Sequence, residues 1–211
     1  MDIKNLRINY SKYEINFGNL PETPIPFFMH WFDDALALNK EEANACVLST
    51  VSEKNTPTSR VVLLKAINEK GFTFFTNYTS VKAKDIENNQ HVALNFYWPQ
   101  LERQVRITGI AQQISATESD AYFKSRPRES QIGTWVSQQS KTIKLSHNFK
   151  ENVTKIENEF KDKEVKRPAH WGGFCIVPNR IEFWQGRPSR LHDRLVYDLD
   201  GKIWNKKRLA P

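Results

Sequence analysis

Short apolar runs of strand length, joined by short links, are the feature that most limits how this chain can fold. Such runs cover residues 45–51, 59–66, 71–76 and 91–98. The sequence Asn68-Glu-Lys-Gly71 between the second and third runs has turn-forming residues at both ends and predicts a hairpin. Links of this length are too short for the crossovers that parallel strands need. The first half of the chain is therefore predicted to be antiparallel β structure.

Strand character returns in the rest of the chain. Further strands are expected at 103–114, 173–177, 180–184, 194–199 and 202–208, and Asp200-Gly201 predicts a hairpin turn before the last of them. Short links between strands, with helices interposed, favour one antiparallel barrel over βαβ units. The expected fold is mainly β with added helices, in the α+β class.

The expected helices have clear start signals or apolar faces. Residues 24–39 carry an amphipathic stripe with Pro26 in the first turn, and residues 80–88 are predicted to form a short helix. Ser115 and Glu118 match a capping box, which predicts a helix over 116–124 that Pro127 ends. Residues 148–161 place apolar residues on one face of a further packing helix.

Size and composition bound the class of protein. With 211 residues, the chain is expected to form a single domain over 1–211. No signal-peptide core and no run long enough to cross a bilayer is found, so a cytoplasmic protein without a membrane partner is expected. Cys46 and Cys175 lie far apart without a CxxC pair, which favours reduced, buried thiols. A formal charge of +7 predicts attraction to polyanions or to phosphorylated small molecules, without choosing between them.

Several common catalytic motifs are absent from the sequence. It has no GxGxxG, P-loop, HExxH or GxSxG pattern, which excludes the usual dinucleotide-binding, NTPase, zincin and serine-hydrolase types. The five histidines lack the spacing of metal ligands, so no metal site is expected.

Two clusters of cations could bind anions. Arg60 and Lys65 bracket four apolar residues, and on a regular strand they would point to opposite faces. If that strand is buried, both need anions, whereas an edge strand would leave both in water. Tyr122, Arg126 and Ser130 are spaced by four around a helix end and the next helix start, which fits a phosphate cup. A surface salt-bridge cluster would give the same pattern.

A third cluster lies near the C-terminus. If residues 190–194 are extended, Arg190, His192 and Arg194 share one face, and an anion or an electron-rich ring beside them would relieve their repulsion. Trp184, nearby in sequence, could equally be a core aromatic residue.

Six motifs in this order resemble the pyridoxine/pyridoxamine 5′-phosphate oxidase family. They are Arg60-x4-Lys65, Arg126-Pro-x2-Ser-Gln-Ile-Gly, Trp171-Gly-Gly, Glu182-Phe-Trp-Gln-Gly, Arg190-Leu-His-Asp-Arg194 and Arg208-Leu-Ala-Pro. The resemblance runs from about Arg7 to Pro211. It implies an FMN-binding split β-barrel and a homodimer whose two flavin sites are shared across the interface, with residues 1–20 as a lid segment and 169–211 as a dimerisation and active-site region.

The implied reaction is the FMN-dependent oxidation of pyridoxamine 5′-phosphate and pyridoxine 5′-phosphate to pyridoxal 5′-phosphate, with dioxygen reduced to hydrogen peroxide. By this resemblance, FMN would be held by Arg60, Val61, Val62, Leu63, Leu64, Lys65, Phe75, Thr76, Lys82, Gln104, Gln139, Ser140, Trp184 and Arg194. The substrate phosphate would lie against Lys65, Tyr122, Arg126 and Ser130, the pyridine ring against Arg190 and His192, and the lid residues Arg7 and Tyr10 over the substrate.

Arg190 and His192 are the expected catalytic residues. Arg190 is permanently protonated and should position the substrate, whereas His192 can titrate near neutral pH and is expected to accept a proton. The sequence departs from the family pattern at Val81, where Ser80-Val81-Lys82 replaces Ser-Arg-Lys, and Phe75 stands where tyrosine is frequent. FMN is therefore expected to bind more weakly than with arginine at position 81.

Two alternatives remain open from the sequence. One is a different enzyme on the same barrel, such as a flavin reductase or a haem-handling or deazaflavin-using protein, against which the substrate-side residues argue. The other is a basic β-barrel that binds nucleic acid through exposed aromatic residues. The family resemblance predicts no nucleic-acid partner, and a yellow rather than a colourless protein would separate the two classes.

Overall fold

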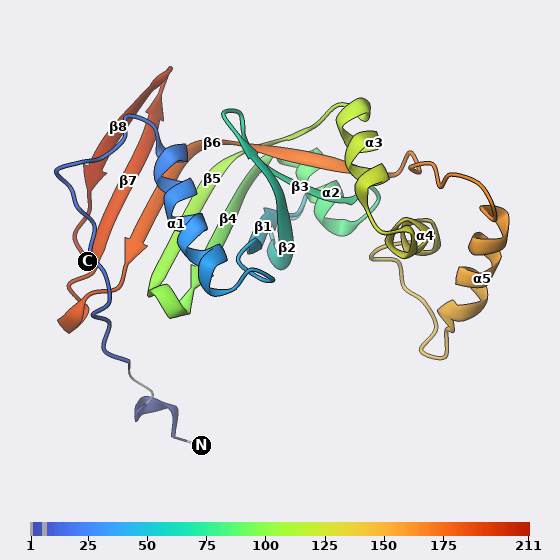
Figure 1. Ribbon diagram of the computed structural model, residues 1–211, viewed down its shortest axis with the longest axis horizontal. Coiled ribbons are helices and arrows are strands. Elements are labelled where there is room, and N and C mark those ends of the chain that lie inside the picture. The colour runs from blue at the N-terminus through green and yellow to red at the C-terminus, as the bar shows by residue number, and fades with distance from the viewer. Residues whose placement is uncertain (1, 6–7) are drawn as a thin grey trace.

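The computed structural model describes residues 2–5 and 8–211. Eight strands in this part of the chain form one sheet in the order β3-β2-β1-β4-β5-β6-β7-β8, and a further pairing of β3 with β6 closes the first six into a barrel. Every pairing is antiparallel. The hairpin of β7 and β8 extends the sheet beyond the barrel (Figure 1). The predicted α+β fold with an antiparallel barrel is confirmed.

The strand and helix bounds follow the predicted segments closely. The strands are β1 (Ala45–Val51), β2 (Pro57–Asn68), β3 (Gly71–Asn77), β4 (His91–Trp98), β5 (Arg103–Gln113), β6 (Trp171–Gln185), β7 (Asp193–Asp200) and β8 (Ile203–Arg208). The helices are α1 (Pro24–Leu38), α2 (Val81–Asn88), α3 (Ala116–Ser125), α4 (Arg128–Val136) and α5 (Phe149–Glu159), with 3-10 turns at Ile3–Asn5, Pro99–Leu101 and Pro188–Arg190. None of the helices in the described residues is long and apolar enough to cross a membrane.

Strand β6 differs from its prediction. Two separate strands at 173–177 and 180–184 were expected, but one strand of 15 residues runs through both. Pro178 is tolerated inside it because the register with β5 shifts there, between Thr108 and Gly109. Gly109 also makes room, since a Cβ at that position would lie 2.2 Å from the Val177 carbonyl oxygen. As a result, the first half of β6 pairs with β3 inside the barrel and the second half pairs with β7 outside it.

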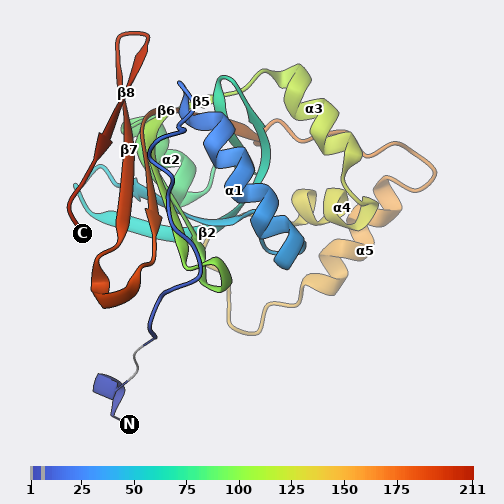
Figure 2. The ribbon, with the colours of Figure 1, turned by 60° about the vertical axis from the view of Figure 1, so that its left-hand side comes forward.

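Helix α1 supplies much of the core. Its predicted apolar stripe faces inward, and Phe28 is fully buried with its ring centroid 4.9 Å from that of Phe72 and 5.2 Å from that of Phe96. Both ribbon views show α1 lying across the barrel strands (Figures 1 and 2). The two cysteines, Cys46 and Cys175, are buried and free, as predicted, and burial raises the pKa of the Cys46 thiol to about 12.

Helices α3, α4 and α5 gather at one end of the barrel around a second, smaller apolar cluster (Figure 1). The predicted capping box is present, because Ser115 accepts from the Glu118 amide and Glu118 accepts from the Ser115 amide. The predicted helix at 148–161 is also present as α5, but it packs shallowly. It has no fully buried residue, and Phe149 on its apolar face is 46% exposed.

Candidate active site

One group of candidate residues surrounds a hollow of about 480 Å³ at the rim of the barrel, where β2 and β3 meet α3. We call it the rim site. It is lined by Arg60, Val61, Val62, Leu63, Lys65, Phe75, Thr76, Lys82, Tyr122, Arg126, Gln139 and Trp171. Four of these side chains are cations, and none of the described residues in this lining is an aspartate or glutamate. The rim site therefore has the charge of an anion-binding site.

The arrangement along β2 corrects one expectation. Arg60 and Lys65 were expected to serve opposite faces of a regular strand, but both line the rim site. The hollow takes in the consecutive residues 60–63 of β2 as well as Lys65, so it is not confined to one face of the strand. A register irregularity between Leu64 and Ala66 also leaves Lys65 without a partner on β3. Leu64 points instead into the core and is 4% exposed.

Lys82 and Arg60 are held rigidly in the rim site. Lys82 is 8% exposed, and its Nζ lies 3.3 Å from Thr76 Oγ1 and 3.4 Å from Ser80 Oγ, with no ion pair among the described residues. Burial and the nearby Arg60 charge lower the pKa of Lys82. Arg60 donates to the hydroxyls of Thr50 at 2.8 Å and Thr58 at 2.6 Å, and its Nη2 lies 3.9 Å from Asp85 Oδ2, which is outside the lining. A buried ammonium without a carboxylate partner favours a bound anion.

An aromatic wall closes one side of the rim site. The Phe75 ring stacks on Tyr122 at a centroid distance of 3.9 Å and on Trp171 at 5.4 Å. The Arg126 guanidinium lies 4.6 Å from the Trp171 ring centroid and donates to Thr134 Oγ1 at 2.7 Å. Trp171 was not among the predicted site residues, and its Trp-Gly-Gly motif was the available signal. Such a wall suits a flat ring beside the cations.

An adjoining hollow of about 330 Å³ lies between β3 and α4. Arg126 lines both hollows, whereas Tyr122 lines only the first and Ser130 only the second, so the predicted phosphate cup is spread over the two. Gln139 accepts from Thr76 Oγ1 at 3.2 Å, and Ser140 accepts from the Val81 amide at 3.3 Å at the start of α2. Further lining residues that were not among the predicted site residues are Asn77, Gly133, Thr134 and Ser137.

A second group of candidates lies around a hollow of about 630 Å³ that we call the tail site. It is lined by Ile8, Asn9, Tyr10, Arg187, Ser189, Arg190 and His192. The His192 ring packs on Trp184 at a centroid distance of 4.6 Å and on Tyr10 at 6.1 Å. Burial, followed by the Arg190 charge, lowers the pKa of His192. Arg7, predicted beside Tyr10, lies outside the described residues.

A hydrogen bond fixes the orientation of the His192 ring. The Arg187 amide donates to His192 Nδ1 at 3.1 Å. In the neutral ring, Nδ1 is therefore the acceptor and Nε2 carries the hydrogen. This is at odds with the expectation that His192 accepts a proton, because its one lone pair is already engaged.

The predicted common face of Arg190, His192 and Arg194 is wrong. Pro188 starts a 3-10 turn in which Ser189 and Arg190 have φ values of 56° and 62°, and β7 begins only at Asp193. Residues 190–194 are thus not a continuous extended segment. Arg194 also needs no outside anion, since its guanidinium pairs with Glu182 Oε1 at 2.8 Å.

Arg194 instead belongs to a row that crosses three strands. Gln104 on β5 is directly opposite Trp184 on β6, and Trp184 is directly opposite Arg194 on β7. Directly opposed residues share a face of the sheet, with Cβ atoms about 5 Å apart. The backbone carbonyl of Ala210 accepts from Arg194 Nη1 at 3.0 Å, which fixes the end of this row. The three predicted flavin contacts on these strands are therefore neighbours.

The rim and tail sites lie far apart within one chain. Trp171 of the rim site and Trp184 beside the tail site are at opposite ends of β6, whose 15 residues span roughly 45 Å at the usual rise per strand residue. One small molecule cannot contact both groups of a single chain. The predicted site residues thus form two clusters.

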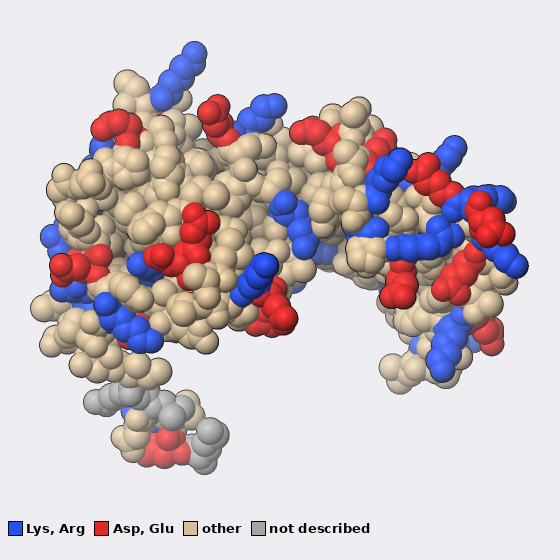
Figure 3. Space-filling view, in the orientation of Figure 1, with Lys and Arg blue, Asp and Glu red and all other residues tan. Residues whose placement is uncertain are grey.

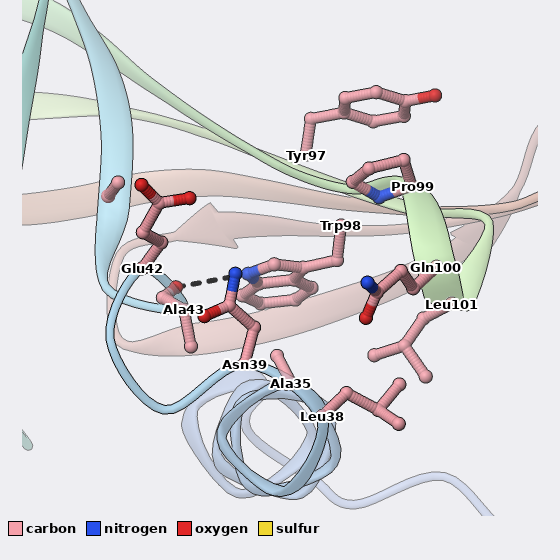
Figure 4. A pocket seen from close by; sticks show the side chains of 11 residues that line it. Ala35, Leu38, Asn39, Glu42, Ala43, Tyr97, Trp98, Pro99, Gln100 and Leu101 are labelled. Carbon is pink, nitrogen blue, oxygen red and sulfur yellow. Dashed lines mark hydrogen bonds between the residues drawn. The ribbon is translucent and has the colours of Figure 1, made fainter.

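A further hollow of about 230 Å³ lies between the end of α1 and the link from β4 to β5 (Figure 4). Its floor contains Trp98, whose Nε1 donates to the Ala43 carbonyl at 3.0 Å, and its polar groups include Glu42 and Gln100. No lysine, arginine or histidine occurs among the described residues of this lining. It does not suit a phosphate.

Comparisons with known proteins identify the family of this chain. Residues 32–160 match the family model of pyridoxamine 5′-phosphate oxidase, and residues 171–211 match the model described as the pyridoxine 5′-phosphate oxidase C-terminal dimerisation region. The pyridoxine/pyridoxamine 5′-phosphate oxidase of a Cyanothece species is 45% identical over 211 residues, covering 100% of this chain and 99% of that protein. The oxidase of Cytophaga hutchinsonii is 47% identical over 212 residues, with the same coverage.

Solved structures share the fold. PhzG from Burkholderia lata, in complex with tetrahydrophenazine-1-carboxylic acid, has a TM-score of 0.89 at 24% identity, covering 96% of this chain and 100% of that one. An FMN-binding protein from Nostoc punctiforme, related to pyridoxamine 5′-phosphate oxidase, has a TM-score of 0.73 at 15% identity, covering 91% and 100%. Because the family models and the full-length relatives agree, this chain belongs to the pyridoxine/pyridoxamine 5′-phosphate oxidase family.

Proposed function

We propose that this enzyme uses FMN to oxidise pyridoxamine 5′-phosphate and pyridoxine 5′-phosphate to pyridoxal 5′-phosphate, with dioxygen reduced to hydrogen peroxide. The observation that carries the proposal is the rim site, where four cations and an aromatic wall surround a hollow without an acidic residue in its described lining. Phosphate groups and flat rings, which the cofactor and both substrates contain, match this chemistry.

The residues of the rim site fit FMN. Lys82 is buried without an acidic partner among the described residues, and Arg60 is oriented by two hydroxyls beside it. We assign the FMN phosphate to these two cations and to the start of α2, where Ser140 is held by the Val81 amide. FMN would supply a hydride acceptor and a route for the electrons to dioxygen.

The remaining flavin contacts would come from a second copy of the chain. Gln104, Trp184 and Arg194 form the row near the tail site, about the length of β6 away from Lys82. A two-fold dimer that places the tail site of one copy on the rim site of the other would give two equivalent active sites. The match of residues 171–211 to a dimerisation region supports this arrangement.

The substrate would bind between the same two surfaces. Its phosphate is assigned to Lys65, Tyr122, Arg126 and Ser130, which line the rim site and the adjoining hollow. Its pyridine ring is assigned to Arg190 and His192, with Tyr10 covering it. Arg190 holds and polarises the substrate because a guanidinium does not lose its proton in this pH range.

The hydrogen bond from the Arg187 amide changes the role that we assign to His192. With Nδ1 occupied, His192 Nε2–H is a donor that can orient an oxygen or nitrogen of the substrate. The lowered pKa of His192 keeps this neutral, donating form populated at neutral pH. We therefore propose that His192 positions the substrate rather than removing a proton.

The charges over α5 on one face of the molecule do not favour the nucleic-acid alternative. Over α5, on the face shown in Figure 3, lysine and arginine side chains alternate with aspartate and glutamate instead of forming a basic patch.

The direct test of the proposed reaction is to add FMN and pyridoxamine 5′-phosphate to the purified protein in air. Equal amounts of aldehyde and hydrogen peroxide are expected, and a protein that binds FMN but yields neither would refute the proposed reaction.

A further inference from the structure

Two buried carboxylates attach the segment before α1 to the rest of the molecule: Asp193 accepts from the Ile15 amide at 3.3 Å, and Glu102 holds the part of the segment next to Tyr10. We call residues 8–15 the N-terminal strap. Glu102, in the link between β4 and β5, accepts two hydrogen bonds through Oε2, from the Ser11 amide at 2.8 Å and the Lys12 amide at 3.0 Å. The ribbon views show the chain rising past the end of the sheet before it enters α1 (Figures 1 and 2).

Glu102 is an unusual residue for a turn. It is 4% exposed and has a left-handed backbone with φ 54°, a conformation that suits glycine better than glutamate. In the described part of the chain its carboxylate makes no ion pair, and the strap amides are the hydrogen-bond donors to it. A buried charge is stable only with such partners, so the position of the strap and the burial of Glu102 depend on each other.

The strap carries Tyr10 directly onto the tail site. The Tyr10 ring lies 5.7 Å from the Trp184 ring centroid, edge to face, and 6.1 Å from that of His192. Gly186 makes room beneath it, because a Cβ there would lie 2.7 Å from Tyr10 Cγ. Glu102 also fixes this floor, since its backbone carbonyl accepts from the Gly186 amide at 2.7 Å. One residue therefore ties both the cover and the floor of the tail site.

Neighbouring contacts reinforce the attachment. Lys12 Nζ donates to the Gln100 carbonyl at 2.7 Å, and the Arg103 guanidinium lies 4.9 Å from the Tyr13 ring centroid. These contacts use a flexible lysine and a partly exposed ring, whereas the carboxylate binds the main chain. Glu102 binds the backbone amides of Ser11 and Lys12, so this attachment of the strap does not depend on the side chains at positions 11 and 12.

We propose that Glu102 is a positioning residue that holds the strap closed, so that Tyr10 covers the substrate at the tail site. The effect on substrate rests on the proposed function, whereas the attachment of the strap does not. Loss of the carboxylate should free the part of the strap that carries Tyr10, whereas residues 13–15 keep their contacts with Asp193 and Arg187. It should weaken retention of the substrate and leave FMN binding unchanged, since no strap residue is assigned to the flavin.

Two variants and one control test the attachment. Glu102→Gly removes the carboxylate at a position whose left-handed backbone glycine adopts without strain, so the fold should be kept. Limited trypsin digestion after Lys12, followed by mass spectrometry, should run roughly tenfold faster than in the parent protein. Glu102→Gln keeps an acceptor oxygen and should restore most of the protection, and the exposed Glu41→Gln should have no effect. Cleavage of Glu102→Gly at the parental rate would overturn the proposal.

Kinetics then test the role in positioning. Glu102→Gly should raise KM for pyridoxamine 5′-phosphate roughly tenfold with kcat changed less than about twofold, because the strap contributes binding in both the ground state and the transition state. If Glu102 acts through Tyr10, the double variant Glu102→Gly with Tyr10→Ala should have no higher KM than Glu102→Gly alone. A double variant in which the two increases combine in full would show that Glu102 does not act through Tyr10. Should the parent protein oxidise no substrate, the proposed function fails, but the trypsin experiment still decides whether Glu102 holds the strap.

Discussion

Trp171 and Trp184 lie at the two ends of the single strand β6, and each packs into a different group of site residues. Trp171 stacks in the aromatic wall of the rim site, whereas Trp184 contacts His192 at the tail site. The strand leaves the barrel halfway along its length and carries the tail site outward. In the dimer that we propose, each chain would contribute its rim site to one active site and its tail site to the other.

The buried ammonium of Lys82 provides the first prediction. Lys82→Met should weaken FMN binding by roughly tenfold to a hundredfold, because a charge-assisted contact to phosphate is lost. Thermal stability without FMN should not fall, since burial already disfavours the charge and lowers the pKa of Lys82. The matched control is Lys84→Met, exposed on the same helix. Fluorescence titration with FMN measures the affinity, and an unchanged value would remove Lys82 from the phosphate site.

Val81 provides a gain-of-affinity prediction. Its side chain is 49% exposed at the start of α2, next to the Lys82 cation. Val81→Arg should tighten FMN binding roughly tenfold by adding one charge-assisted hydrogen bond. Val81→Met, similar in length but uncharged, is the control. FMN titration at two salt concentrations checks the result, and equal affinity in the arginine and methionine variants would show that position 81 does not reach the phosphate.

The proposed role of His192 as a hydrogen-bond donor through Nε2 can be tested with amide side chains of different length. In His192→Gln the amide nitrogen can stand where Nε2–H stands, whereas His192→Asn places its polar atoms near Nδ1. If Nε2 is a donor, glutamine should keep more of kcat/KM than asparagine, by roughly tenfold. His30→Asn, at an exposed position, is the control. Equal and severe losses with the alcohol substrate in both variants would favour a proton acceptor.

The pH dependence follows from the same group. Because the pKa of His192 is lowered, its neutral form persists below the value of about 6.5 that a free histidine has. Activity should therefore stay level as the pH falls from 8 to about 6.5 and decline only below that, when protonation of Nδ1 breaks the bond from Arg187. The decline should be absent from the pH profile of His192→Gln. A midpoint above 7 for the parent enzyme would contradict this assignment.

Glu182 contributes both to the stability of the fold and to the position of Arg194 in the row of proposed flavin contacts, Gln104, Trp184 and Arg194. It is 3% exposed and pairs with both Arg106 and Arg194. Glu182→Gln should lower the free energy of unfolding by roughly 1 to 3 kcal/mol and also weaken FMN binding, because Arg194 is no longer held. Asp198→Asn removes a more exposed ion-paired carboxylate and should cost less than about 1 kcal/mol without affecting FMN. Urea unfolding and FMN titration distinguish the two, and equal effects would refute the special role of Glu182.

Most of the fold could be predicted because its signals are local. The apolar run that becomes β1, the capping box at Ser115 and the Asp200-Gly201 turn all depend on residues a few positions apart. The single strand β6 could not be predicted, because Pro178 normally ends a central strand and is tolerated only where the distant Gly109 allows a register shift.

The site was predictable where strands or motifs set it, and less so where turns do. The row from Gln104 to Arg194 depends on which strands pair and in which register. The family motifs imply these three residues as flavin contacts, whereas the alternation of apolar residues does not place them together. The left-handed turn at Ser189 and Arg190 broke the expected common face. The attachment of the strap by Glu102 joins positions 91 residues apart, and no local pattern indicates it.

Complementation between two inactive variants tests the shared site most directly. Lys82→Met damages the rim site and Arg194→Met the flavin row beside the tail site, so each should be nearly inactive alone at low FMN. When the two chains are co-expressed and the dimers form at random, half are mixed, and each mixed dimer has one intact site. Oxidation of pyridoxamine 5′-phosphate should then recover to about a quarter of the parental rate. Activity no greater than the sum of the separate variants would contradict a site built from two chains.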